Sequence, residues 1–303
     1  MNKLCILVCV VSAVTLGLLT GCQTDDKEPE ITDAVQETAE ESIAETTGTT
    51  EAYVLPDLSS GSASSIEGRT VIVSILANDD RYRWDGSDPD SAALDNMISF
   101  LGIACDYLTQ QAERYGCNAE FIYDFKSDDD LAYHFDSGIP LTDIDDLDLP
   151  VWEYIDSSID TSRILKEYQA DNIIYLVLID SDSANVVPPC TRFWYRGMPY
   201  PYEIVYMYNR DHHTLNCPAV YAHEILHTFG AYDLYQADIS IGLDRSEVRN
   251  VSNAVPNDIM LTCSDIETDA YVYDRITNDI TEVTAYYLGL TDSAELLDKI
   301  GIQ

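Results

Sequence analysis

The alternation of apolar and polar positions along the chain predicts strands separated by helices. Residues 70–77 and 172–180 are continuous apolar runs, rich in β-branched residues, with the length of buried strands. Between them, from 91 to 115, apolar residues recur at intervals of three and four, the spacing of an amphipathic helix. The first half of the chain is therefore expected to alternate between strand and helix.

Shorter segments extend this pattern. Residues 120–125 and 203–208 are expected to form strands, and residues 157–169 a helix. The period-two pattern of 203–208 suggests a strand with one covered and one wetter face. The acidic segment 126–150 is expected to be mostly loop, and the proline-rich segment 186–203 is expected to interrupt regular structure.

The second half begins with a helix opened by Pro218, because proline is tolerated in the first helical turn. Residues 230–274 are expected to be irregular, and helices near 276–288 and 292–300 close the chain. These elements predict an α/β (α+β) fold. It has an N-terminal lobe with a twisted mixed sheet and long helices, and a smaller irregular or helical C-terminal lobe.

Residues 1–21 have the form of an export signal, in which Lys3 precedes an uncharged, mostly apolar run. The run ends in Leu-Thr-Gly-Cys, which resembles the bacterial lipobox and implies cleavage before Cys22 and lipid attachment to its sulfur. Two or more acyl chains would hold the protein at the cell surface without a spanning helix. A plain secreted protein, or one with an uncleaved anchor, is the alternative.

Residues 22–65 form an acidic segment rich in Thr, Ser, Ala and Glu, with eleven acidic residues and one lysine. The segment has few large apolar residues, so burial cannot offset the entropy lost on ordering. We expect it to be a flexible tether between the lipidated cysteine and the folded domain. That domain is assigned to residues 66–303.

The chain has a formal net charge of −38, of which about −29 belongs to the expected folded domain. Such a surface repels nucleic acid and anionic lipid and favours neutral or basic peptide or protein partners. The acidic runs 128–130 and 143–148 could bind Ca²⁺ through their oxygens. No complete calcium-loop pattern is present, so solvated acidic loops are the simpler interpretation.

Five cysteines remain in the expected domain, an odd number for an exported protein. One or two disulfides are plausible outside the cell, with at least one thiol left over. The spacing lacks the CxxC pairs of a structural zinc site, and the sequence leaves the connectivity open. The five residues are Cys105, Cys117, Cys190, Cys217 and Cys263.

The segment HEILHTFGAYDLY, residues 223–235, carries the candidate chemistry. Residues four apart on a helix point the same way, so His223 and His227 can place two imidazole nitrogens on one Zn²⁺. Glu224 lies one step round the helix, where its carboxylate can take a proton from an attacking water. The alternative is a surface helix with two histidines and an incidental glutamate.

A catalytic zinc needs a third protein ligand and an open position. Gly230 can adopt the left-handed conformation that ends a helix, and the turn would bring Asp233 back toward the metal. Glu247 is the alternative third ligand, in the arrangement of thermolysin-like peptidases, whose third ligand is a glutamate on a later helix. If neither residue binds a metal, Asp233 caps the turn and Glu247 is an exposed salt-bridging residue.

The motif His223-Glu224-x-x-His227-x-x-Gly230-x-x-Asp233 resembles the metzincin-type signature HExxHxxGxxH, with aspartate replacing the third histidine. This variant occurs in snapalysin and the immune inhibitor A group of secreted bacterial metallopeptidases. The resemblance implies a metzincin-like fold, a cleft above one catalytic zinc, and endopeptidase activity. Met260 is the candidate for the methionine of the family's turn beneath the metal, although simple core packing also explains it.

Several metzincins have a tyrosine two residues after the turn methionine that assists the oxyanion, but Thr262 occupies that position here. The stabiliser of the transition state is therefore open. Solvated turn positions are the alternative reading for the two adjacent histidines among the candidates. The candidates are Tyr235, His212, His213, Tyr271 and Tyr273.

Three functions are compatible with these residues. The leading hypothesis is a cell-surface zinc metalloendopeptidase in which Glu224 acts as general base and then protonates the leaving amine. The second is a non-catalytic surface lipoprotein that binds zinc or a partner, against which Glu224 argues because metal binding alone needs no carboxylate there. The third is a zinc amidase that acts on a non-peptide substrate.

Overall fold

The computed structural model describes residues 55, 63, 65–84, 88–142, 144–181, 189–192, 201–211, 213–237 and 243–301. The expected export signal, Cys22 and nearly all of the expected tether lie outside these residues. Within the described residues, helices are all too short or too polar to cross a membrane. All of the described residues belong to one compact unit, Glu51–Gln303.

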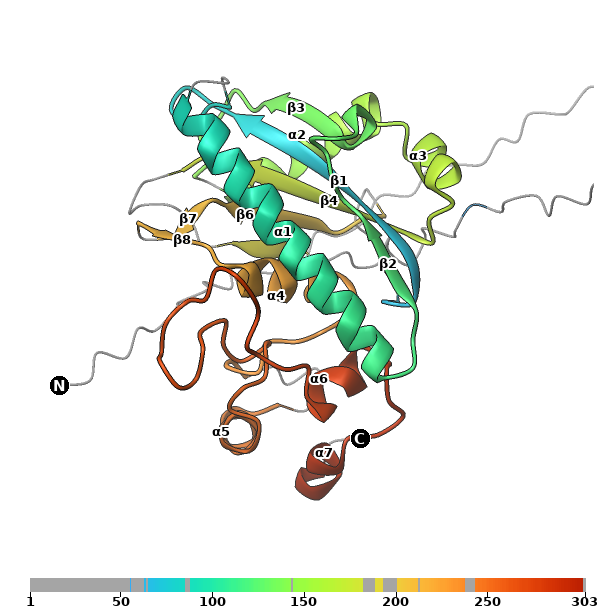
Figure 1. Cartoon of the computed structure of the whole chain (residues 1–303), viewed down its shortest axis with the longest axis vertical. Helices are drawn as coiled ribbons and strands as arrows, with labels where there is room; N and C mark the ends of the chain where they lie inside the picture. The colour runs from blue at the N-terminus through green and yellow to red at the C-terminus, as the bar shows by residue number, and fades with distance from the viewer. Residues whose placement is uncertain are drawn as a thin grey trace, which may run out of the picture. The chain divides into compact units, whose positions relative to one another are not determined.

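A six-stranded mixed sheet forms the upper part of the protein (Figure 1). Its central path runs β2-β1-β4-β6-β5, and β3 pairs with the same edge of β1 as β2, further along the strand. All pairings are parallel except β5 with β6. The strands are β1 (Gly68–Asn78), β2 (Ala119–Ile122), β3 (Ala132–Asp136), β4 (Asn172–Ile179), β5 (Cys190–Arg192) and β6 (Ile204–Tyr208).

The centre of the sheet is covered on both faces. Every residue of β4 is buried, as expected for a continuous apolar run in a parallel sheet. Every residue of β6 is buried as well, so the prediction of a wetter face for this strand was wrong. Tyr206 and Tyr208 produced the misleading alternation, because their rings are buried while their hydroxyls bond to Asp148 and to the Leu141 carbonyl.

Helices connect the parallel strands. The helix α1 (Asp88–Arg114) follows β1 and precedes β2 in the chain, and Figure 1 shows it crossing in front of the sheet. The helices α2 (Ile144–Ser158) and α3 (Thr161–Tyr168) connect β3 to β4, in the opposite direction across β1. Since parallel crossovers are right-handed, α2 and α3 lie on the face opposite α1.

The C-terminal part lies below the sheet (Figure 1) and is tied to α1. Tyr115, just after α1, donates from its hydroxyl to the Ile280 carbonyl at 2.9 Å, and Arg114 pairs with Asp279 at 3.4 Å. Among the described residues, the chain after β6 forms short elements only, of which the β7–β8 hairpin lies level with the sheet in Figure 1. They are the hairpin β7 (Arg210–Asp211) and β8 (Thr214–Leu215), and α4 (Pro218–Thr228), α5 (Arg245–Ala254), α6 (Glu282–Tyr287) and α7 (Glu295–Ile300).

The prediction of a mostly loop segment at 126–150 was wrong. It contains the 3₁₀ turn η1 (Asp129–Leu131), β3, and the beginning of α2. Leu147, Val151 and Ile155 recur at intervals of four and are fully buried, so the helical period was present but interrupted by acidic residues. The acidic run 128–130 makes contacts within the protein: Asp128 caps η1, and Asp130 pairs with Arg163 at 2.9 Å.

Four further expectations need correction. The segment expected to be irregular contains α5, which begins with a capping box between Asp244 and Glu247. The proline-rich segment contains β5, and the two closing helices are shorter than expected. The described part of the chain contains no disulfide, and Cys217 and Cys263 are free thiols.

Asp79 anchors the loop after β1 and allows a prediction about stability. Burial opposes its ionisation, but backbone N–H groups of Leu141, Tyr82 and Arg81 hydrogen bond to it and lower its pKa. A lowered folded-state pKa stabilises the fold at neutral pH, and this stabilisation is lost as pH falls below the ordinary aspartate range. Asp79→Asn should therefore lower the free energy of unfolding by about 1–3 kcal/mol at pH 7.

The measurement is urea unfolding of both proteins at a series of pH values. The difference between the wild type and Asp79→Asn should shrink below about pH 4, where the wild-type carboxylate becomes protonated. A difference that is constant from pH 7 to pH 3 would contradict an ionic role for Asp79.

Candidate metal centre

The helix α4 carries the two histidines into the interior. Cys217 precedes it in an extended conformation, and Pro218 occupies the first turn, where its missing N–H costs no helical hydrogen bond. Every residue of α4 is buried, and the helix packs against α1, with Tyr221 in edge contact with Phe100. His223 and His227 are each 6% exposed, so the imidazoles are held within the protein.

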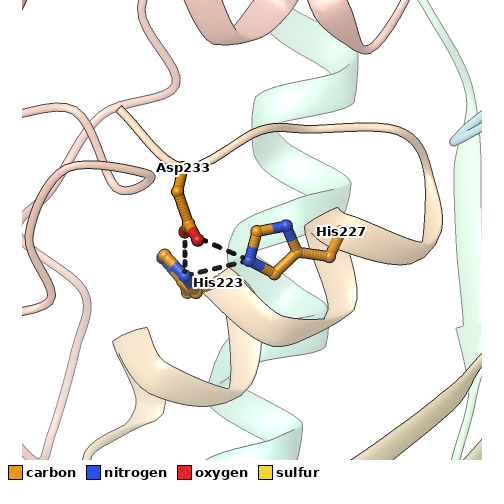
Figure 2. Close-up of side chains that lie close together, drawn as sticks. All are labelled: His223, His227 and Asp233. Carbon is orange, nitrogen blue, oxygen red and sulfur yellow. Dashed lines mark hydrogen bonds and ion pairs between the residues drawn. The ribbon is translucent and has the colours of Figure 1, made fainter. Parts of the chain in front are cut away.

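Three side chains converge at one point (Figure 2). The Nε2 atoms of His223 and His227 are 3.2 Å apart, and each lies 3.2–3.3 Å from Oδ1 of Asp233. For a tetrahedral ion with bonds of about 2.0–2.1 Å, neighbouring ligand atoms are separated by roughly 3.3 Å. The three atoms thus have the spacing of one face of such a tetrahedron, and they could hold a metal ion.

Asp233 reaches this point through a tight turn. Gly230 has φ of +95°, a conformation that a side chain would strain, and it reverses the chain directly after α4. The N–H of Leu234 then donates to the Met260 carbonyl at 2.9 Å, which fixes the backbone beside Asp233. Oδ2 of Asp233 accepts from Gln236 at 2.7 Å, while the buried Oδ1 faces the imidazoles.

Backbone carbonyls orient both rings. Nδ1 of His223 lies 2.9 Å from the Ile259 carbonyl, and Nδ1 of His227 lies 2.9 Å from the Ala231 carbonyl. A carbonyl oxygen only accepts, so each Nδ1 carries a hydrogen. In a neutral ring, the lone pair is then on Nε2 and points toward the convergence point. Carbonyl partners of this kind are common behind metal-bound histidines.

The charges around the cluster are strongly coupled. Burial opposes ionisation of Asp233, but hydrogen bonds from His223 and His227 hold its pKa well below the ordinary range. Burial also opposes protonation of His223, yet Cys263 and Asp233 beside it raise the pKa of the imidazole. Without a cation at the centre, a proton is therefore favoured on His223, and a bound metal would have to displace it.

Glu224 lies beside the cluster and is held by the edge strand β5. The Thr191 hydroxyl lies 2.7 Å from the Glu224 carbonyl and 3.1 Å from its Oε2. Burial raises the pKa of the Glu224 carboxyl, against the opposing effect of the two histidines. A buried carboxylate with a raised pKa that accepts a hydrogen bond from a hydroxyl is a candidate for a general base.

The other predicted ligands and turn residues are also located. Glu247 accepts from the Asp244 backbone N–H at 2.7 Å in the capping box of α5, so its carboxylate is used there and is not in the His223–His227–Asp233 cluster. Met260 is fully buried, and the carbonyl of the residue before it, Ile259, bonds to His223.

The tyrosine candidates for transition-state stabilisation differ in position. Tyr235 stacks on His223 with ring centroids 6.3 Å apart and is 38% exposed, so it lies at the rim of the cluster. Tyr273 donates from its hydroxyl to the Leu215 carbonyl at 3.2 Å, and Tyr271 is half-buried against the core. The ring contact of Tyr235 with His223 makes it the candidate for which a direct contact with a cluster histidine is seen.

The remaining candidates are two histidines near the β7–β8 hairpin. His213 is an exposed turn residue with φ of +69°, between β7 and β8. This position agrees with the solvated-turn reading. His212 lies outside the described residues.

The groups that support the cluster are not marked by any motif in the sequence. Thr191 is 33 residues from Glu224, and the Ile259 carbonyl is 36 residues from His223. Cys263, whose side chain interacts with His223, was considered only as a disulfide candidate. No local pattern marks such contacts, because they depend on how distant segments pack.

A scan against protein-family models and a search of curated proteins both find no match to this chain.

Proposed function

We propose that this protein is a zinc-dependent peptidase of the metzincin type, tethered by lipid on Cys22 to the outside of a bacterial cell. His223, His227 and Asp233 would hold the ion. The observation that carries the proposal is the spacing of their three ligand atoms, 3.2–3.3 Å, together with a buried glutamate on the same helix.

The donor set fits zinc. Imidazole nitrogens and a carboxylate are ordinary zinc ligands, and three protein ligands leave a fourth position for water or substrate. When bound, zinc supplies Lewis acidity, which lowers the pKa of water and polarises a carbonyl oxygen.

The protein's own groups would carry the proton transfers. Glu224 accepts a proton from the attacking water and passes it to the leaving amine, while Thr191 holds its carboxylate in place. The raised pKa of Glu224 favours this exchange because the group can both accept and return a proton. Metal binding alone does not call for this carboxylate, whereas general-base catalysis does.

The substrate class follows from the surface charge. With 54 acidic and 16 basic residues, the chain favours neutral or basic peptides over acidic ones. Zinc chemistry alone does not distinguish a peptide from a non-peptide amide. A peptide substrate is proposed because residues 223–233 resemble the signature of peptidases.

The proposal is tested with purified protein lacking residues 1–21. Metal content is measured by mass spectrometry after dialysis against zinc, and a mixed peptide library is incubated with the metal-loaded and chelator-treated forms. We expect one zinc per chain, cleavage by the loaded form, and recovery when zinc is returned to the chelated form. Zinc binding without cleavage across a broad library would favour a binding protein instead.

The identity of the third ligand gives a sharper prediction. Asp233→Ala removes a ligand atom, so zinc affinity should fall by more than about 100-fold, beyond the loss typical of a supporting residue. Glu247→Ala removes only a helix cap and should leave zinc affinity unchanged, with a stability loss of about 1 kcal/mol. Competition with a chromophoric chelator measures both affinities, and the reverse order would reassign the third ligand.

A further inference from the structure

We propose that Asp258 is a positioning residue that fixes two of the three candidate ligands through the backbone of the next two residues. The inference rests on the proposed zinc site for its functional meaning. Its structural basis lies in contacts that are present without any metal.

Asp258 is fully buried and has four hydrogen-bond donors around its carboxylate. Oδ1 accepts from the Met260 N–H at 2.8 Å and from the Thr284 hydroxyl at 2.7 Å. Oδ2 accepts from the Thr281 N–H at 3.1 Å and from the Thr281 hydroxyl. Burial raises the pKa of this carboxyl against the effect of these donors. Such a group is costly to bury and needs all its partners.

The turn held by Asp258 has two consecutive carbonyls in use, one bonded to a cluster histidine and the other to the backbone next to Asp233. The Ile259 carbonyl is 2.9 Å from Nδ1 of His223, and the Met260 carbonyl accepts from the Leu234 N–H at 2.9 Å. Leu234 adjoins Asp233. A shift of this turn would therefore move a histidine and the aspartate together, whereas His227 is oriented by Ala231 from its own segment.

The chemistry at position 258 requires a carboxylate. Both its oxygens accept from donors, and an asparagine of the same shape would place an amide N–H₂ against one pair of them. Asp258→Asn would then leave either the Thr281 donors or the Met260 and Thr284 donors facing another donor. The turn would have to move to relieve this, and its carbonyls would move with it.

The test compares Asp258→Asn with Asp79→Asn. Asp79 is also a buried carboxylate, accepts three backbone N–H groups, and lies in the loop after β1. We expect Asp258→Asn to weaken zinc binding by about 10–100-fold, as loss of a supporting hydrogen bond does at other metal sites. Asp79→Asn should lower the melting temperature but leave zinc affinity unchanged. Equal zinc affinity in Asp258→Asn and wild type would overturn the proposal.

A second readout does not depend on zinc. Long-range ¹H–¹⁵N NMR of the metal-free protein reports which ring nitrogen of each histidine carries the hydrogen. The Nδ1 resonance of His223, which faces the Ile259 carbonyl, should change in Asp258→Asn, while the Nδ1 resonance of His227, which faces the Ala231 carbonyl, should change much less. Unchanged His223 resonances would overturn the proposal.

Two further outcomes are separated by this design. If wild type binds no zinc, the proposed function fails, and the NMR comparison still decides whether Asp258 orients His223. If Asp258→Asn does not fold, Thr284→Val removes one donor while keeping the carboxylate, and we expect a several-fold loss of zinc affinity. Unchanged affinity in that variant would count against the proposal.

Discussion

Replacing Glu224 by glutamine should lower kcat/KM for peptide cleavage by about 10²–10⁴-fold, the usual contribution of a general base. Glutamine has the same shape and can still accept from Thr191, so the helix and cluster should stay in place. It cannot take a proton from water. One zinc should therefore remain bound while turnover is lost.

The measurement is kcat/KM on the best peptide from the library, with zinc content and melting temperature recorded for each protein. Glu247→Gln is the matched control, because it makes the same change on α5, outside the cluster. It should keep wild-type activity. If Glu224→Gln cleaves at the wild-type rate, the role of Glu224 and the proposed mechanism are wrong.

The second large effect is expected at His227. His227→Ala should reduce zinc from one per chain to a trace, because it removes one of three ligands and leaves a buried space beside Asp233. Zinc stabilises the folded state in proportion to the logarithm of its concentration over Kd. Added zinc should therefore raise the melting temperature of wild type but not that of His227→Ala.

The control for this variant is His213→Ala, which removes an exposed histidine from the β7–β8 turn. Zinc content and the zinc-dependent rise in melting temperature should match those of wild type. A zinc response in His227→Ala as large as in wild type would mean that the ion binds elsewhere. Differential scanning fluorimetry with and without chelator gives both comparisons.

The cluster was predictable because its residues are close in the sequence. His223, His227 and Asp233 lie within one helix and one turn, so helical geometry and the conformational freedom of Gly230 were enough to bring them together. Thr191 and Asp258 were not predictable by the same means. Their roles arise from pairing of β5 with β6 and from packing of the turn at 258–260 against α6.

The fold shows the same division. The predictions came close to the observed bounds of β1 and β4, which are continuous apolar runs, and of α1, whose helical spacing extends over many turns. The prediction failed at the start of α2, where Asp148 interrupts the apolar pattern between the buried residues Leu147 and Val151. It also failed at α5, whose capping box was a local signal that the charged composition concealed.

The helix α1 has a mechanical consequence. Its 27 residues span roughly 40 Å as one rigid rod. Along its length it contacts β2 and the helix that carries the histidines, and just beyond its end Tyr115 bonds to Ile280. Any scissor-like opening between the sheet and the C-terminal part would have to bend this rod or break that bond. For the proposed peptidase, the choice among peptides would therefore depend on their fit to a fixed site and not on closure of one part of the protein upon the other.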